Sequence, residues 1–233
     1  MFILQIIILL YIIFVIYNII DIQKYNRNGL IIDISDKVYI RNIEKIKEEC
    51  YSLNPVLITS KNDKLSLEKI IKMDKSYFIE DDKQIIKLNK LKSIKSINIF
   101  KNFKICDDLN LYNLIHFNLD FFENYLLFNR KYALSIFKNY HITDLNPCKH
   151  NINIIYILEG EITIYLFNPK HKNEIMNKKL NTIKKYAHKY VLTKDNLLLI
   201  PPNWYYIEEI NNNALQYHID CDNYFTFIYN MIK

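Results

Sequence analysis

The sequence predicts a mainly β fold with flanking helices, a β-sandwich or small barrel such as a jelly roll, preceded by one N-terminal transmembrane helix. Two observations support this prediction. Nineteen residues after Met1 form one uncharged apolar run, and the C-terminal half contains many short apolar segments separated by tight turns. The chain has 233 residues, half of them apolar, which suits one domain with a sizeable core.

The apolar run reads FILQIIILLYIIFVIYNII and covers residues 2–20. As a helix it would be roughly 28 Å long, about one hydrocarbon core of a bilayer. A cleaved signal peptide would have a basic start and a small-residue cleavage site, and the sequence shows neither. A buried core helix is rarely apolar on every face. The prediction is a single-pass membrane anchor over residues 1–20, with residues 21–36 as a linker.

Charges and thiols predict on which side of the membrane the domain lies. Only Met1 precedes the anchor, and the basic residues that follow it are Lys24, Arg27, Lys37 and Arg41. The positive-inside rule therefore places the C-terminal domain in the cytosol. The cysteines, at positions 50, 106, 148 and 221, form no C-x-x-C pair and are expected to be free buried thiols. The sequence also lacks any N-x-S/T glycosylation acceptor, which agrees with a cytosolic domain.

Residues 37–233 are expected to form one domain. Helical patterns cover residues 42–53, residues 66–73 with Ser66 as N-cap, and residues 109–125. Strands are expected at residues 54–60, at two segments within 76–88, and at 197–200, 215–220 and 224–229. Residues 152–158 and 161–167 flank Glu159-Gly160, which predicts a β-hairpin because glycine supplies the positive φ of a tight turn.

Four segments together resemble a known family. They are NPVLIT (54–59), YHITDLNP (140–147), NINIIYILEGEITIYLFNP (151–169) and DNLLLIPPNWYYIEE (195–209). In this order and spacing they resemble the Jumonji-C-like, cupin-like family, in a degenerate form, over residues 37–229. The resemblance implies a double-stranded β-helix whose double proline turns the chain at the rim of the barrel. It also implies a pocket rim formed by Trp204, Tyr205 and Tyr206.

The chemistry of that family depends on residues that this chain lacks. Active members hold Fe(II) with two histidines and one carboxylate, and a lysine binds 2-oxoglutarate. The corresponding positions are Pro147 and Lys149, or Asn146 and Cys148, for the first two ligands, Tyr206 for the distal histidine, and Ile162 for the lysine. The resemblance therefore implies a pseudoenzyme with no metal, no cosubstrate and no catalytic residue.

The six histidines are scattered along the sequence. A rewired metal site could combine Cys148 and His150 with His141 just upstream, but the family does not use that geometry. The ordinary interpretation of these histidines is that they are solvated or hydrogen-bonded in the core. No pattern of a serine or cysteine nucleophile with an ordered base is present, and two distant glycines cannot form a phosphate-binding loop.

Residues 170–189 carry seven lysines against one acid, Glu174. This insert is either a solvated segment or an anion-binding surface centred on Lys178, Lys179, Lys184 and Lys185. Beside a membrane, lipid headgroups would be the nearest anions, so anionic lipid is favoured over nucleic acid.

Two classes of function follow from the sequence. The first is a membrane-anchored, non-catalytic cupin-like module that binds a protein partner or scaffolds an assembly. The alternative is an oxygenase, similar to protein hydroxylases, that uses Fe(II) and 2-oxoglutarate at an atypical metal site. A carbohydrate-binding or sugar-modifying cupin is a third, weaker hypothesis.

Overall fold

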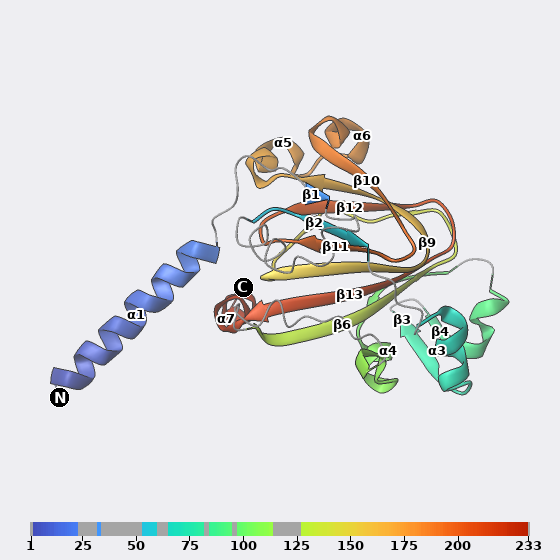
Figure 1. Ribbon diagram of the computed structural model, residues 1–233, viewed down its shortest axis with the longest axis horizontal. Coiled ribbons are helices and arrows are strands. Elements are labelled where there is room, and N and C mark those ends of the chain that lie inside the picture. Colours follow the sequence, from blue (N-terminus) through green and yellow to red (C-terminus); the bar gives the residue numbers. More distant parts are fainter. Residues whose placement is uncertain are drawn as a thin grey trace.

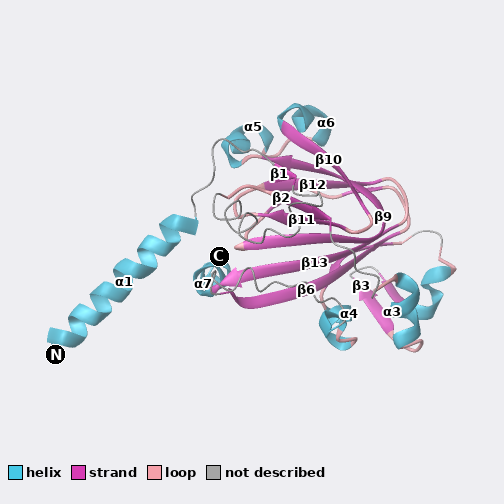
Figure 2. Cartoon of the chain, in the orientation of Figure 1, coloured by secondary structure: helices cyan, strands magenta, loops and turns pink. Residues whose placement is uncertain are grey.

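The computed structural model describes residues 2–22, 32–33, 53–59, 65–81, 84–94, 97–113 and 127–232. Within these residues the fold is a large curved β-sheet with short helices on its outer faces and one long helix that projects from the domain (Figure 1). The structure is therefore mainly β with flanking helices, as the sequence predicts. Figure 2 shows the strands in magenta, stacked between the small helices at either side.

Eleven of the described strands belong to one sheet that curves back on itself. The major sheet has the order β1-β2-β11-β9-β13-β6-β5, and the minor sheet contains β7, β8, β10, β12 and the C-terminal half of β9. The bounds of the major-sheet strands are β1 Ile32–Asp33, β2 Val56–Thr59, β5 Asn98–Asn102, β6 Leu127–Phe137, β9 Ile152–Phe167, β11 Asn196–Ile200 and β13 Ala214–Asn223. The others are β7 His141–Ile142, β8 Asn146–Pro147, β10 Ala187–Thr193 and β12 Tyr205–Ile210.

The predicted hairpin at Gly160 is wrong, because β9 runs through this residue as one strand of 16 residues. Its first half pairs with β11 and β13, and its second half pairs with β10 and β12. Gly160 has a φ of +81°, and a Cβ atom there would lie 2.1 Å from the carbonyl oxygen of Asn213. Positive φ serves a bend inside a strand as well as a turn, so the glycine alone did not distinguish the two.

Side chains of both sheets meet in an apolar interior. Ile155 and Ile157 of the major sheet pack there with Ile162, Ile164 and Leu166, which β9 contributes to the minor sheet. Strand alternation sends the neighbouring residues outward. A second cluster covers the outer face of the major sheet, and a third covers the outer face of the minor sheet. The domain is thus a two-sheet barrel between two outer layers.

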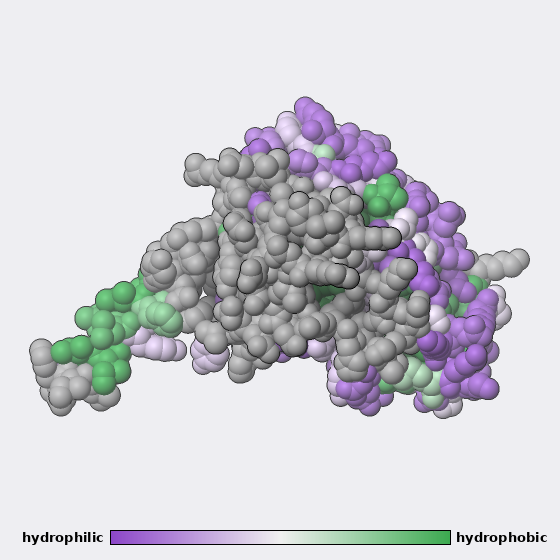
Figure 3. Space-filling view, viewed as in Figure 1, coloured by the Kyte–Doolittle hydropathy of each residue, from purple (hydrophilic) through white to green (hydrophobic). Residues whose placement is uncertain are grey.

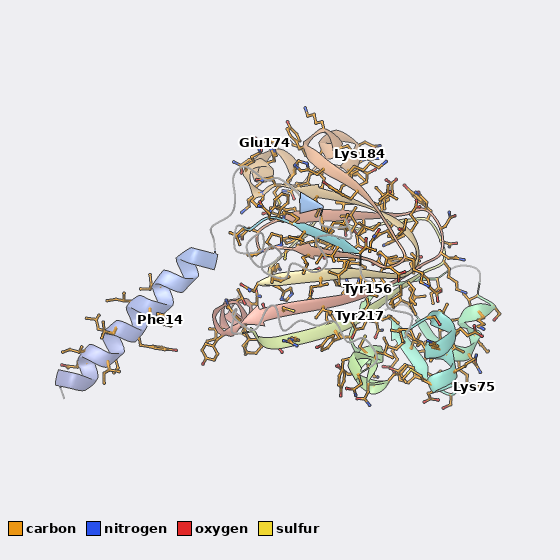
Figure 4. All side chains as sticks on the ribbon, viewed as in Figure 1. Phe14, Lys75, Tyr156, Glu174, Lys184 and Tyr217 are labelled. Carbon is orange, nitrogen blue, oxygen red and sulfur yellow. The ribbon has the colours of Figure 1, made fainter. Side chains whose placement is uncertain are left out.

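Short helices cover the outer face of the major sheet. They are α3 Leu67–Met73, the 3₁₀ helix η1 Leu88–Lys92, α4 Lys104–Asp108 and the 3₁₀ helix η2 Leu111–Asn113. Ile70, Leu91 and Ile105 from these helices pack in the same cluster as Tyr156 and Tyr217, which are direct partners on β9 and β13 and are labelled in Figure 4. This packing explains why the outer face of the major sheet is apolar.

Several local predictions are confirmed. Ser66 caps α3, since its hydroxyl accepts a hydrogen bond from the backbone N–H of Lys69 at 3.2 Å. The two short strands around the acidic turn are β3 Phe78–Asp81 and β4 Gln84–Lys87, which pair in antiparallel fashion. The strands predicted at residues 54–60, 197–200 and 215–220 correspond to β2, β11 and β13. Cys106, Cys148 and Cys221 are free and buried.

The strand predicted at residues 224–229 is wrong, because this segment is the helix α7, Tyr224–Ile232. Asn223 caps it: the Asn223 Oδ1 accepts a hydrogen bond from the Thr226 backbone N–H at 2.8 Å. Alternating aromatic and β-branched residues suggested a strand, and this cap together with packing on the barrel decided for the helix. The helix predicted at 42–53 and most of that predicted at 109–125 lie outside the described residues.

The helix α1 covers Phe2–Ile22 and projects away from the barrel (Figure 1). Its described side chains are apolar and exposed from Ile6 to Phe14 and at Ile16, and Figure 3 shows this segment as a hydrophobic surface. Within the part of the chain that the structure describes, no helix has the length and apolarity needed to cross a membrane. In the predicted linker, Ile32–Asp33 forms β1 and pairs in parallel with β2.

We expect Gly160→Ala to destabilise the domain strongly. A side chain at positive φ costs roughly 1–2 kcal/mol, and the clash with the Asn213 carbonyl adds to this cost, so the free energy of unfolding should fall by more than about 2 kcal/mol. Urea unfolding measures the change. Glu161→Ala, at the exposed next residue of β9, is the control and should cost much less. Equal losses for the two variants would contradict the proposed constraint at Gly160.

Candidate functional site

The structure brings together the residues that correspond, by the resemblance described above, to the metal ligands of the Jumonji-C-like, cupin-like family. β8 pairs with β12, so that Asn146 and Tyr206 are direct cross-strand partners. The backbone N–H of Cys148 donates to the Trp204 carbonyl at 2.7 Å, and the N–H of Asn203 donates to the Cys148 carbonyl at 2.9 Å. Asn146, Cys148, Trp204 and Tyr206 therefore lie close together at one end of the minor sheet.

Two of these residues are buried in the barrel. The Cys148 thiol donates to the Ile200 carbonyl at 3.4 Å, and burial raises its pKa to about 12. Burial also raises the pKa of Tyr206 well above its ordinary value, and the charges of Glu208 and Asp220 add to this rise. Both groups therefore stay neutral near neutral pH.

The three predicted rim aromatics lie in two different places. Trp204 and Tyr206 are buried in the interior cluster, and the indole N–H of Trp204 donates to the Leu53 carbonyl at 3.2 Å. Tyr205 has the opposite orientation on β12 and packs against the outer cluster of the minor sheet. Strand alternation thus separates Tyr205 from the other two. Ile162, at the family's lysine position, lies in the apolar interior.

Lys101 of β5 also contributes its side chain to this part of the barrel. Lys101 lies in a bulge of β5, where the register with β6 shifts between Ile99 and Asn102, and its φ is +46°. The backbone N–H of Lys101 donates to Ser135 Oγ at 2.9 Å. Its Nζ lies 3.4 Å from Asp220 Oδ1 and 6.0 Å from the centre of the Tyr206 ring. Bulges redirect side chains in this way, and strained residues of this kind cluster at functional sites.

The inner face of β13 is polar. Leu215, Tyr217 and Ile219 pack outward, so the alternate residues Gln216 and His218 point into the barrel. The Nε2 atom of His218 lies 3.0 Å from Ser135 Oγ and 3.0 Å from Gln216 Oε1. Since an amide oxygen only accepts, this arrangement places the proton on Nε2. Burial, reinforced by the Lys101 charge, lowers the pKa of His218 well below its ordinary value, so the ring is neutral.

Glu208 faces this strand from β12 and is fully buried. Neither of its carboxylate oxygens has a hydrogen-bond partner among the described residues, and the same is true of Gln216 Nε2 and His218 Nδ1. Burial raises the pKa of Glu208 to about 7, and the nearby Lys101 charge limits the rise. The carboxyl group of Glu208 is therefore partly protonated near neutral pH.

The polar interior continues to the end of the barrel beyond Asp220. His150 lies between two buried carboxylates, with Nδ1 at 3.0 Å from Asp222 Oδ2 and Nε2 at 3.4 Å from Asp220 Oδ2. The Asn153 amide also donates to Asp220. Lys101, Ser135, Glu208, Gln216, His218 and Asp220 form what we call the polar cluster of the barrel. In the described segments, no group of three or more His, Cys, Asp and Glu side chains is placed to hold a metal ion.

The polar cluster was missed by sequence reasoning. His218 was noticed only as a scattered histidine, and Lys101 not at all, because four different strands, β5, β6, β12 and β13, supply the cluster. One signal was available: Gln216, His218 and Asp220 alternate with Leu215, Tyr217, Ile219 and Cys221 along one strand. Polar side chains on the inward face of a buried strand indicate a site or a buried network.

The basic insert lies over the outer face of the minor sheet. It contains the 3₁₀ helix η4 Pro169–His171, α5 Lys172–Ile175, α6 Leu180–Ile183 and the 3₁₀ helix η5 Lys184–Tyr186. The four lysines predicted as anion-binding, Lys178, Lys179, Lys184 and Lys185, are all exposed. Lys184, labelled in Figure 4, is already engaged, since its Nζ lies 3.9 Å from Glu209 and 5.0 Å from the centre of the Tyr165 ring.

A cavity of about 350 Å³ lies at the opposite end of β13 from Asp222, beside Gly160 and Asn213. Its two charged groups make structural contacts. Glu159 accepts a hydrogen bond from the first N–H of α3 at 2.8 Å, and the Lys138 ammonium donates to the Leu91 carbonyl. The charged groups that line this cavity therefore already have hydrogen-bond partners, whereas several polar atoms of the polar cluster have none among the described residues.

Comparisons with known proteins add little to this geometry. No protein-family model matches the chain, and no curated protein matches it. Among solved structures, a cupin superfamily protein from Desulfitobacterium hafniense is similar, with 13% sequence identity and a TM-score of 0.30 over 40% of this chain and 68% of that chain. A TM-score this low supports no conclusion about what the chain does.

Glu208→Gln should stabilise the domain at high pH. The pKa of Glu208 is about 7 in the folded state against 4.5 for the free side chain, so the unfolded state loses its proton first as pH rises. The free energy of unfolding should therefore fall between about pH 4.5 and 7, by about 3 kcal/mol in total. At pH 8 the free energy of unfolding of the glutamine variant should be higher than that of the parent by about that amount. At pH 4 the difference should be much smaller.

Urea unfolding of parent and variant at each pH provides the test. His218 contributes the opposite trend below about pH 6.5, because its lowered pKa favours the unfolded state in acid. Since both proteins contain His218, the difference between them isolates Glu208. A difference that does not change with pH would show that Glu208 is not a buried carboxyl with a raised pKa.

Proposed function

We propose that this chain is a membrane-attached, non-catalytic binding module built on a cupin-like barrel. The proposal of a cupin-like domain is supported by the topology, in which one bent strand contributes to both sheets and the sequence segments that suggested the family lie on adjacent strands. The proposal of a binding role is supported by buried polar groups of the interior, such as the Glu208 carboxylate and the Gln216 amide nitrogen, that have no hydrogen-bond partner among the described residues.

One observation argues most strongly against iron. The family's ligand positions are occupied by Asn146, Cys148 and Tyr206, of which the last two are buried with raised pKa values. An amide, a neutral thiol and a neutral phenol do not fit Fe(II), which the family binds with imidazole and carboxylate groups. The residues present therefore do not fit the metal.

The polar cluster does not offer an obvious substitute for this site. Asp220 already contacts Lys101 and His150, and Nε2 of His218 is used by Ser135 and Gln216. A metal ion among these groups would also lie close to the Lys101 ammonium, which would repel it. The same lysine would instead attract an anionic or hydrogen-bond-accepting group of a partner.

The non-catalytic proposal and its alternative, an oxygenase with a rewired site, predict different results in one experiment, and the expected result is that of the non-catalytic proposal. Full-length protein in detergent, supplied with Fe(II), 2-oxoglutarate and ascorbate, should bind less than stoichiometric iron and release no succinate above the blank. Metal analysis and succinate detection measure the two quantities. Stoichiometric iron with succinate release, abolished by His218→Ala or His150→Ala, would overturn the non-catalytic proposal.

Membrane attachment is the second part of the proposal. It is supported by the helical conformation of α1 and by the exposure of its apolar side chains. A large apolar surface of this kind is unfavourable in water and marks an interaction site. Placing the barrel in the cytosol follows the distribution of basic residues after α1. The exposed lysines of the insert support a further proposal, an anion-binding surface for lipid headgroups or an acidic protein.

Carbonate extraction tests the attachment. The full-length protein should stay with membranes, and replacing Ile12 and Ile13 with lysine should release it, because each central lysine costs roughly 2.5–3.5 kcal/mol on the insertion scale. The control is a pair of lysines at exposed barrel positions, Ile85→Lys and Val191→Lys, which should not change the result. Release of the unmodified protein by carbonate would contradict the attachment.

A further inference from the structure

The C-terminal helix α7 turns its polar side chains toward the barrel. Thr226 is buried and bonds to Asn223 at the start of the helix. One turn later the Asn230 amide donates to the Lys149 carbonyl at 3.0 Å and to Asp222 Oδ1 at 3.4 Å. Residues four apart share one face of a helix, so this polar face is the one that docks on the barrel.

The other described side chains of α7 form an apolar stripe. Tyr224, Phe227, Ile228 and Met231 follow the spacing i, i+3, i+4, i+7 of a single helix face. Tyr224 is 47% exposed and Met231 is 72% exposed, while Phe227 and Ile228 are half-buried. A helix docked on a soluble domain normally buries its apolar face and exposes its polar one. The described residues of α7 have the reverse arrangement, with the polar face on the barrel and the apolar face turned away from it. An apolar environment outside the barrel would stabilise this arrangement.

Two features indicate what that surrounding is. The first is contact with α1: α7 packs against the apolar helix that we propose to attach the chain to a membrane (Figure 1). The second is charge. Arg130 and Lys131, near the start of β6, and Lys149 are exposed on the end of the barrel that carries α7. The acids nearby on β13, Asp220 and Asp222, are buried and paired with His150.

We infer that α7 and this basic rim form a second membrane contact, with the apolar stripe at the boundary between headgroups and acyl chains of an anionic bilayer. An apolar face flanked by basic residues is the pattern of helices that lie in the membrane interface. Aromatic side chains such as Tyr224 favour that depth, and Arg130, Lys131 and Lys149 would contact lipid phosphates. The inference rests on the proposed attachment by α1 and adds to it a fixed orientation of the barrel.

This orientation has a consequence for the polar cluster. Asn230 of α7 bonds to Asp222, which in turn contacts His150, so the helix is linked directly to the charged end of the barrel interior. With α7 in the interface, that end lies next to the membrane surface. The basic insert, which covers the outer face of the minor sheet, becomes a separate surface.

Tryptophan scanning with brominated lipids tests the inference in the full-length protein reconstituted into vesicles. Three single variants place a reporter on α7 (Met231→Trp), on the basic insert (Met176→Trp) and on β4 (Ile85→Trp), at exposed positions in each case. The native Trp204 is fully buried and supplies the same background in all of them. In vesicles of brominated phosphatidylcholine and phosphatidylserine, about a twofold loss of the added emission is expected for Met231→Trp. No loss is expected for the other two variants.

A charge variant separates headgroup binding from apolar contact. Replacing Arg130, Lys131 and Lys149 with glutamine should weaken the quenching of Met231→Trp in phosphatidylserine vesicles to the level seen in neutral vesicles. The matched control replaces three exposed lysines at the far side of the domain, Lys69, Lys75 and Lys90, and should leave quenching unchanged.

The outcomes distinguish this inference from the attachment itself. Protein that resists carbonate but shows no quenching at position 231 would overturn the inference and leave attachment by α1 intact. Quenching at position 176 in place of 231 would assign the membrane-facing surface to the basic insert and likewise overturn it. Protein that carbonate releases and that shows no quenching at any position would overturn both proposals.

Discussion

The bend of β9 at Gly160 is the constraint on which the rest of the structure depends. One strand of 16 residues pairs with β11 and β13 before the bend and with β10 and β12 after it, so it holds the two sheets face to face. The close approach of the Asn213 carbonyl leaves no room for a side chain at the bend. Every strand that supplies the polar cluster is positioned by β9, either directly or through β13.

The charges inside the barrel compensate one another. A low-dielectric interior tolerates charges only when partners compensate them. Here Lys101, delivered by a strained bulge, contacts Asp220 and limits the rise in the pKa of Glu208. The same cation lowers the pKa of His218. A lysine at the centre of such a cluster opposes a bound metal ion, while it leaves Glu208 and Gln216 with unused hydrogen-bonding capacity.

Most of the outer apolar surface of the two sheets is covered by other elements of the chain. Small helices cover the apolar outer face of the major sheet, and the basic insert covers that of the minor sheet. Two elements break this pattern, α1 with its exposed apolar side chains and α7 with its apolar stripe turned outward. They contact each other, so the exposed apolar side chains of these two helices lie on one side of the molecule. A gathered apolar surface next to basic side chains is more informative than isolated exposed hydrophobic residues.

The sequence by itself determined the mainly β class and the short elements with local signals. Ser66 predicted its helix because capping is a local interaction. The pairing of Asn146 with Tyr206 came only from the structure. Only the tertiary structure decided the rest. Partners distant in the sequence decided that Gly160 forms a bend and not a turn. They also decided that the residues after Asn223 form a helix and not a strand. The polar cluster depended on strand pairing in the same way, because Lys101, Glu208 and His218 come from three strands whose proximity no local pattern encodes.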